Sequence, residues 1–341
     1  MYNSKSAYRS AWDNAYTDDP SIPLNVDIEL ASICNLACPM CYYGEADFIS
    51  EMKEEREWDG GKKRRFMPTE MAIKLIDECA SIGVPALKMN FRGESTLHPD
   101  YSEILKYARS RPDITDIGEM CRMGGVPRSA FHDLLVNTNA NCNDKAIDGL
   151  MAATKVMVSL DSMVPETYAK MRVNGKLERA LEVIDELRKR KHPDLWVRRV
   201  ITSINKKEKF VESVKYRFGN DIKVSEHFSF DRNHYEHLMI DDSEMKSWDR
   251  QYCGYPSQRL IVTSNGKVMA CCVAWRDETL VGYWPDQSIM QIWNGQPIQS
   301  LRRILREGAY ERAPTLCQNC TSFMSYKRKE RDYVQDKEAV G

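Results

Sequence analysis

The sequence predicts an α/β protein in which a parallel sheet or barrel of six strands precedes a smaller region of short segments. Strand-like and helix-like segments alternate from about residue 24 to residue 230, which is typical of repeated strand–helix–strand units. After about residue 245, short segments separated by Gly and Pro replace this alternation. We therefore expect a large domain over residues 1–245 and a small domain over residues 246–341.

Each expected strand is a short apolar run, and each expected helix repeats apolar residues at a spacing of three or four. The strands are expected over residues 24–30, 86–91, 134–137, 155–160, 197–204 and 222–230. The first helix is expected to begin at Pro68. Four further helices are expected over residues 99–108, 145–151, 177–190 and 207–217. Residues 44–67 are rich in charge and contain two adjacent glycines, so we expect a solvated insertion or lid there.

The composition excludes several classes of protein. The 341 residues include 49 Lys and Arg against 50 Asp and Glu, and this balance lacks the basic excess of a nucleic-acid-binding protein. The first 30 residues are polar, so we expect no signal peptide. No apolar run reaches the roughly 18 residues of a membrane span. We expect a cytoplasmic protein that binds neither nucleic acid nor membrane.

The eleven cysteines are many for a cytoplasmic protein, in which disulfides are rare. Three of them, Cys34, Cys38 and Cys41, form the pattern CxxxCxxC directly after the first expected strand. Three thiolates can hold a 4Fe–4S cluster and leave its fourth iron open to an external chelate, because such clusters usually take four protein ligands. A zinc knuckle or three unrelated thiols are the plainer alternatives, and the position of the three-cysteine loop directly after the first strand of an α/β pattern disfavours both.

The segment Cys-Asn-Leu-Ala-Cys-Pro-Met-Cys resembles the signature motif of the radical S-adenosylmethionine (SAM) superfamily, and in particular of its SPASM/Twitch branch. The resemblance implies a partial (β/α)6 TIM-like barrel over about residues 22–235. It also implies that SAM chelates the open iron. One electron, supplied through a donor such as flavodoxin or ferredoxin, then cleaves SAM to methionine and a 5′-deoxyadenosyl radical, which abstracts a hydrogen atom from the substrate.

Residues that follow the second strand resemble the family's Gly-Gly-Glu motif, which binds the amino group of SAM. Gly93 and Glu94 match this motif, whereas Arg92 stands in place of its first glycine. This departure leaves the local backbone conformation open, because glycine adopts positive φ without steric cost. An ordinary turn at the end of a strand is the alternative interpretation.

Further positions resemble SAM-binding positions of the family. Ser159 and Asp161, at the end of the fourth strand, resemble the family motif that binds the ribose of SAM. Arg172 belongs to the following segment, whose sequence also resembles that of the family. Asn205 follows the fifth strand, and Tyr42 follows the last cysteine of the loop, where the family often contacts adenine. Ser and Asp also favour strand-end turns for local reasons, and Tyr42 is almost as well explained as a core or surface residue.

The late cysteines form a second pattern, in which Cys253 and Cys271 flank an expected hairpin at Asn265-Gly266 and a CxxC pair follows at Cys317 and Cys320. Four thiolates could hold zinc or a 4Fe–4S cluster, and spacing alone does not decide between them. The pattern resembles the auxiliary-cluster motif of the Twitch domain. The resemblance therefore implies two 4Fe–4S clusters, one that binds SAM and one that is auxiliary.

Three residues are weaker candidates for catalysis. Cys272 is left over beside Cys271, and we interpret it as a buried thiol, as a ligand that exchanges with Cys271, or as a hydrogen donor to a substrate radical. His227 and Arg232 lie at or after the end of the sixth strand, where they would face a substrate in a barrel.

The resemblance leaves several functions open. The first is a radical SAM oxidoreductase that oxidises a small molecule such as a sugar or cyclitol, with the auxiliary cluster as electron acceptor. A radical epimerase would instead return a hydrogen atom from a thiol such as Cys272. A peptide maturase is less expected, because only 33 residues precede Cys34 and a peptide-recognition domain needs more. A zinc-binding module without catalysis is the fourth possibility.

Overall fold

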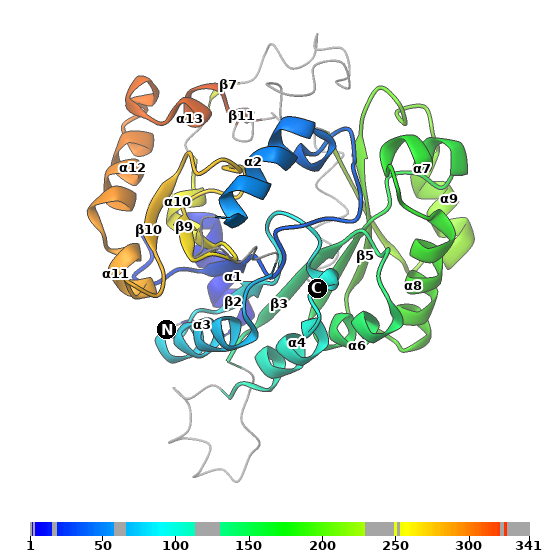
Figure 1. Cartoon of the computed structure of the whole chain (residues 1–341), viewed down its shortest axis with the longest axis horizontal. Coiled ribbons are helices and arrows are strands. Elements are labelled where there is room, and N and C mark those ends of the chain that lie inside the picture. The colour runs from blue at the N-terminus through cyan, green and yellow to red at the C-terminus, as the bar shows by residue number, and fades with distance from the viewer. Residues whose placement is uncertain are drawn as a thin grey trace.

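The computed structural model describes residue 2 and residues 4–15, 19–57, 66–112, 130–228, 249–250, 253–320 and 324–325. Its centre is an open sheet of nine strands in the order β10-β9-β8-β1-β2-β3-β4-β5-β6 (Figure 1). The six strands expected from the sequence are all present, parallel, and adjacent in chain order. The predicted partial barrel of an α/β protein is therefore confirmed.

The parallel strands are β1 (Asn25–Ile28), β2 (Ala86–Lys88), β3 (Asp133–Thr138), β4 (Lys155–Ser159), β5 (Leu195–Ile201) and β6 (Lys223–Phe228). The helices around them are α1 (Lys5–Asn14), α2 (Ala46–Glu57), α3 (Thr69–Ile82), α4 (Tyr101–Ser110), α6 (Asp144–Ala152), α7 (Pro165–Met171), α8 (Leu177–Lys189) and α9 (Phe210–Phe218). In Figure 1, α3, α4, α6 and α8 form an arc outside the strands.

The hairpin predicted around Gly266 is formed by β8 (Arg259–Val262) and β9 (Lys267–Met269), and β10 (Leu280–Tyr283) pairs with β9. Gly266 has φ +87°, and a Cβ at this position would stand 2.2 Å from the carbonyl oxygen of Trp284. β8 pairs with β1 in parallel from Asn25↔Arg259 to Ile28↔Val262. The hairpin therefore extends the barrel sheet and brings the late cysteines alongside its first strand.

The described part of the late region also contains short helices and one small strand pair. Its helices are α10 (Tyr255–Gln258), α11 (Ile289–Trp293), α12 (Gln296–Arg306) and α13 (Thr315–Asn319). The strands β7 (Asp249–Arg250) and β11 (Met324–Ser325) pair with each other. No helix of the described residues is long and apolar enough to cross a membrane.

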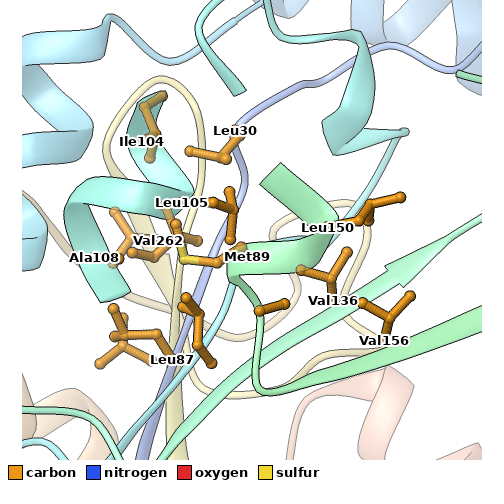
Figure 2. Packing of buried hydrophobic residues seen from close by; sticks show 14 of the residues in the cluster. Leu30, Leu87, Met89, Ile104, Leu105, Ala108, Val136, Leu150, Val156 and Val262 are labelled. Atoms are coloured by element: carbon orange, nitrogen blue, oxygen red, sulfur yellow. The ribbon is translucent and has the colours of Figure 1, made fainter. Parts of the chain in front are cut away.

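Alternation along the strands divides their side chains between two faces. Leu87, Met89, Val136 and Val156 are fully buried in the main hydrophobic core, where Leu87 and Met89 lie beside α4 and Val136 and Val156 lie beside Leu150 of α6 (Figure 2). The residues between them point to the inner face of the sheet. Because the core buries the residues on the outer face, the residues on the inner face are the ones available to an active site.

The charged segment after the cysteine loop, expected as a solvated insertion or lid, is described in its first half only. Its first half forms α2, whose Phe48 and Met52 are buried in a cluster with Tyr42 and Tyr43. Positions 48 and 52 lie on one face of a helix, which explains why this half packs. Residues 58–65 lie outside the described part of the chain.

Candidate active site

The three cysteines of the N-terminal loop line one cavity of about 120 Å³ at the carboxyl ends of the strands. The loop is held tightly, since the Cys41 amide donates to the Cys38 carbonyl at 3.0 Å and the Gly44 amide to the Cys41 carbonyl at 2.7 Å. A Cβ on Gly44 would stand 2.5 Å from the Cys38 oxygen, so the turn requires glycine there. The fold thus gathers these three thiols around a shared space.

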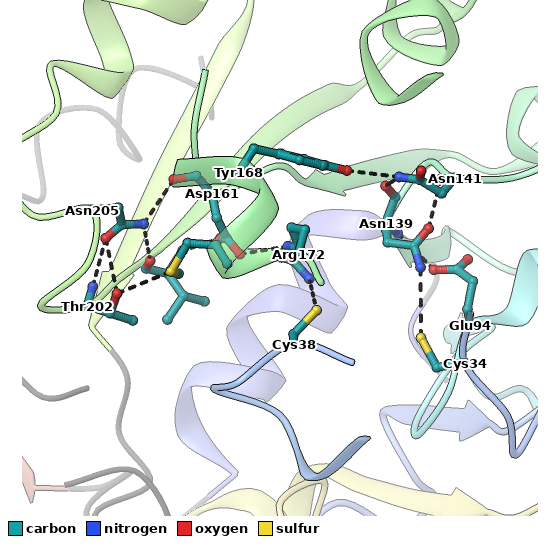
Figure 3. Close-up of polar contacts among 12 residues, drawn as sticks. Cys34, Cys38, Glu94, Asn139, Asn141, Asp161, Tyr168, Arg172, Thr202 and Asn205 are labelled. Carbon is teal, nitrogen blue, oxygen red and sulfur yellow. Dashed lines mark hydrogen bonds and ion pairs between the residues drawn. The ribbon is translucent and has the colours of Figure 1, made fainter. Parts of the chain in front are cut away.

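Two polar side chains contact the thiols directly. Asn139 Nδ2 donates to Cys34 Sγ at 3.8 Å, and Arg172 Nη1 donates to Cys38 Sγ at 3.5 Å (Figure 3). Burial raises the pKa of Cys34 to about 12 and also raises the pKa of Cys38 and Cys41. Thiolates at this site therefore need a positive partner, and a bound metal supplies one. The donor set fits an iron–sulfur cluster with one open position.

Gly93 and Glu94 line the same cavity as the cysteines. Gly93 has φ +68°, and a Cβ there would stand 2.4 Å from the Ala31 oxygen and 2.5 Å from the Ile33 oxygen. The positive φ thus falls on Gly93, and Arg92 is not among the residues with positive φ. The missing first glycine is therefore compatible with the turn.

The Glu94 carboxylate is buried and well bonded. Oε1 accepts from the Thr96 hydroxyl at 2.7 Å and from the Thr138 hydroxyl at 2.8 Å, and Oε2 accepts from the Asn139 amide at 2.8 Å. Burial raises the pKa of Glu94, and these donors oppose the rise. The cavity therefore contains a fixed carboxylate suited to an ammonium group.

Arg172 connects the cysteine loop to the end of β4. Its Nε lies 2.7 Å from Asp161 Oδ2, and Asp161 is fully buried with φ +66° (Figure 3). Burial opposes the charge of the guanidinium, but Asp161 and Cys38 raise the pKa of Arg172 above its usual value. Ser159, the last residue of β4, and Arg172, which follows α7, both line the cavity, and their contact with SAM stays a prediction.

Three predicted SAM contacts lie outside the cavity wall. Asp161 Oδ1 accepts from the Val200 amide at 2.7 Å, and Asn205 donates to the Asp161 and Val200 carbonyls at 2.9 Å. Tyr42 stacks on Trp275 with ring centroids 4.7 Å apart, and its neighbour Tyr43 lines the cavity instead. Direct contact of Tyr42, Asp161 and Asn205 with SAM stays a prediction.

Sequence reasoning missed several residues of the wall. They come from strand ends, from the cysteine loop and from the segment after Cys272: Leu36, Tyr43, Asn90, Asn137, Thr138, Asn139 and Trp275. The polar run Asn137-Thr138-Asn139 at the end of β3 was a usable signal, because carboxyl ends of parallel strands converge. Trp275 gave no such signal, since it enters from the far end of the chain.

The late cysteines also lie near one another. Burial raises the pKa of Cys253 to about 12, and the thiols of Cys272, Cys317 and Cys320 act on it in the same direction. Cys271 is buried beside Cys272, and its thiol donates to Cys272 and lowers the pKa of Cys272. The five late thiols therefore lie in one region of the structure, and ligation of a cluster by Cys253, Cys271, Cys317 and Cys320 stays a prediction. Within the described residues, no three His, Cys, Asp or Glu groups are close enough to hold a single metal ion.

The remaining candidates occupy different positions. Cys272 is partly buried, and the charges of Arg259, Lys88 and Asp27 act on it. His227 is exposed on β6, in register with Val200 of β5. Arg232 lies outside the described residues.

Comparisons with known proteins agree with this geometry. The radical SAM superfamily matches residues 28–216, and an iron–sulfur cluster-binding domain, SPASM, matches residues 253–321. An S-adenosyl-L-methionine-dependent 2-deoxy-scyllo-inosamine dehydrogenase from Niallia circulans is 28% identical over 96 residues, which cover 28% of this chain and 38% of that protein.

Solved structures share the fold at low identity. BtrN in complex with AdoMet and 2-DOIA aligns with a TM-score of 0.51 and 16% identity over 88% of this chain and 94% of BtrN. Tagged anSMEcpe with bound AdoMet gives 0.57 and 14% over 93% of each chain. SuiB of Streptococcus suis bound to S-adenosylmethionine gives 0.53 and 13% over 88% of this chain and 70% of SuiB. Because the superfamily match covers more than half of the 341 residues, the chain belongs to the radical SAM superfamily and carries a SPASM-type domain after its barrel.

Proposed function

We propose that this radical SAM enzyme is an oxidoreductase that acts on a small molecule, with one cluster on Cys34, Cys38 and Cys41. The observation that supports this site is the single cavity shared by the three thiols and Glu94. When bound, SAM and the clusters supply one-electron cleavage to a 5′-deoxyadenosyl radical, hydrogen abstraction, and an acceptor for the electron that the substrate releases. The electron donor is a protein such as flavodoxin or ferredoxin.

The chain's own residues bind and orient SAM in this proposal. Glu94 accepts from the ammonium group of SAM, since its carboxylate lies in the cavity wall and is already oriented by four hydrogen bonds. Arg172 offers a guanidinium to the carboxylate of SAM, and Asp161 holds that guanidinium in place. Ser159 offers a hydroxyl from the end of β4.

The second site is proposed as one auxiliary 4Fe–4S cluster on Cys253, Cys271, Cys317 and Cys320. Four thiolate ligands leave no open iron, so such a cluster suits electron transfer better than substrate chelation. Oxidation is therefore favoured over epimerisation. The proximity of Cys272 to Cys271 supports epimerisation as the second candidate, because a thiol there could return a hydrogen atom.

The cluster assignment is tested with two matched variants of anaerobically reconstituted protein. We expect Cys34→Ala/Cys38→Ala/Cys41→Ala to keep about four irons and to form no 5′-deoxyadenosine. Cys317→Ala/Cys320→Ala should also keep about four irons but still cleave SAM. Formation of 5′-deoxyadenosine by the triple variant, or zinc in the late site, would contradict the assignment.

The reaction type is tested in deuterated water once a substrate is in hand. Oxidation yields a product two hydrogens lighter, without deuterium on carbon. Epimerisation through a thiol places one deuterium on carbon, since thiols exchange with solvent. Carbon-bound deuterium that disappears in Cys272→Ala would replace the oxidase proposal with the epimerase.

A further inference from the structure

The inner face of the barrel sheet is partly open to solvent. On β4, Val156 and Val158 are fully buried in the core, whereas the alternate residues Lys155, Met157 and Ser159 are only partly buried. β5 shows the same alternation, with Val197 buried and Arg198 partly exposed. Because Ser159 lines the cavity that holds the three cysteines, the inner face continues from that cavity.

This inner face carries cations close to the cavity. Arg198 is the register partner of Ser159 on the neighbouring strand. Lys88 ends β2 and precedes Asn90, another residue of the cavity wall, by two positions. Arg259 lies on β8 beside the same layer.

Carboxylates neutralise only part of this charge. Asp27, buried on β1, lies 3.6 Å from Lys88 Nζ and 3.5 Å from Arg259 Nη1, so one carboxylate serves two cations. Both cations also act on Cys272, and they are therefore suited to compensate thiolates of the late site. Neither needs a substrate to explain its position.

Arg198 is different. Among the described residues, the Arg198 guanidinium donates to two neutral atoms, Met157 Sδ at 3.3 Å and Ser225 Oγ at 3.5 Å. Asp161 is the carboxylate whose charge acts on Arg198, and Arg172 already holds Asp161 at 2.7 Å. Burial lowers the pKa of Arg198 to about 10, as expected for a cation without a closely paired carboxylate. The guanidinium remains available to an anion beside the SAM cavity.

We propose that the substrate carries an oxyanion, either a phosphate ester or a carboxylate, and that Arg198 binds it. This inference rests on the proposed function, because it places substrate next to the site of SAM cleavage. A guanidinium matches the paired oxygens of both groups in a planar fork. An amino-substituted cyclitol, such as the inosamine named for the Niallia circulans relative, would bring a second cation to Arg198 instead. The substrate of this chain therefore differs in charge from that compound.

Isothermal titration calorimetry on the reconstituted, SAM-bound enzyme at low salt tests this inference, with inorganic phosphate and acetate as separate probes. We expect one of the two anions to bind and Arg198→Gln to weaken it at least about tenfold, the loss typical of one charge-assisted contact. Phosphate binding assigns a phosphate ester, and acetate binding assigns a carboxylate. Arg217→Gln, which removes an exposed arginine of α9, should leave the affinity unchanged.

Two further variants keep the test decisive. Arg198→Lys keeps the charge but loses the fork, so it should bind the anion with intermediate affinity even if Arg198→Gln assembles poorly. Unchanged anion affinity in Arg198→Gln would overturn the assignment. So would a single variant Lys88→Gln that loses as much anion affinity as Arg198→Gln. Wild-type enzyme that forms 5′-deoxyadenosine but binds neither anion would refute the inference and leave the proposed function standing. Enzyme that binds an anion but never cleaves SAM would refute the proposed function.

Discussion

Removal of the Arg92 side chain should destabilise the contact between the strand ends of the barrel and the late segment that contains Trp275. Arg92 Nε and Nη2 donate to Glu29 at 2.8 and 3.2 Å, and Nη1 donates to the Trp275 carbonyl at 2.9 Å. Glu29 also accepts from the Ser264 amide and hydroxyl at 3.0 and 3.2 Å. One buried pair thus joins β1, the hairpin after β8 and the segment that ends at Trp275.

The magnitude follows from burial. The Arg92 and Glu29 side chains are 2% and 0% exposed, so Arg92→Met leaves a carboxylate without its cation inside the protein. Breaking one partner of such a pair costs about 3–5 kcal/mol. At roughly 2–4 °C per kcal/mol, the midpoint of thermal unfolding should fall by about 6–20 °C. Affinity for SAM should fall as well, because Trp275 lines the cavity.

The assay is anaerobic thermal unfolding of Arg92→Met, Glu29→Leu and the double variant, with SAM binding measured by equilibrium dialysis. The double variant should lose less stability than the sum of the single variants, since it leaves no unpaired charge. Arg217→Gln is the control, because its partner Asp185 and Arg217 itself are 46% and 44% exposed and such pairs contribute about 0–1 kcal/mol. Additive losses, or a loss in Arg92→Met no larger than in the control, would refute the reasoning.

Three other predictions concern single positions. Gly93→Ala places a Cβ within 2.5 Å of two backbone oxygens at φ +68°, so we expect it to abolish SAM binding in equilibrium dialysis, and wild-type affinity would contradict this. Asp133→Asn removes a buried carboxylate that two basic side chains of α1 contact at 2.6 Å. Burial opposes ionisation of Asp133, but these partners lower its pKa, so its stabilisation exists above about pH 4, the unfolded value, and disappears as the pH falls through the native pKa. Urea unfolding of the apo-protein should therefore separate variant from wild type at pH 7 and much less near pH 3, and a constant difference would disprove the linkage. Cys272→Ala should retain about eight irons if Cys271 is the ligand, whereas retention of about four would make Cys272 the ligand.

Local patterns in the sequence predicted the elements but not their distant partners. Apolar alternation identified β1 to β6, and Asn265-Gly266 identified the late hairpin, because both signals lie within a few residues. The parallel pairing of β8 with β1 joins residues more than 230 positions apart, and neither strand's own pattern specifies the other. The same limit explains why Trp275 was not expected beside the cysteine loop.

Motif spacing likewise located strand ends without giving side-chain direction. Glu94 and Asp161 both follow parallel strands, yet Glu94 faces the cavity while Asp161 is bonded to Arg172 and to the backbone of β5. Arg92 was recognised as a departure from the family motif. Its reason, the buried carboxylate of Glu29 directly after β1, becomes visible only when β1 and β2 are placed side by side.

The short segment from Cys271 to Trp275 has a thermodynamic consequence. One end carries a proposed ligand of the late cluster, and the other end forms part of the SAM cavity and stacks on Tyr42. Ordering this segment from either end lowers the conformational entropy that remains to be lost at the other. In the proposed arrangement, cluster assembly and SAM binding are linked, and each raises the affinity for the other by the same factor. Measured SAM affinities of this protein therefore have meaning only together with the iron content of the sample.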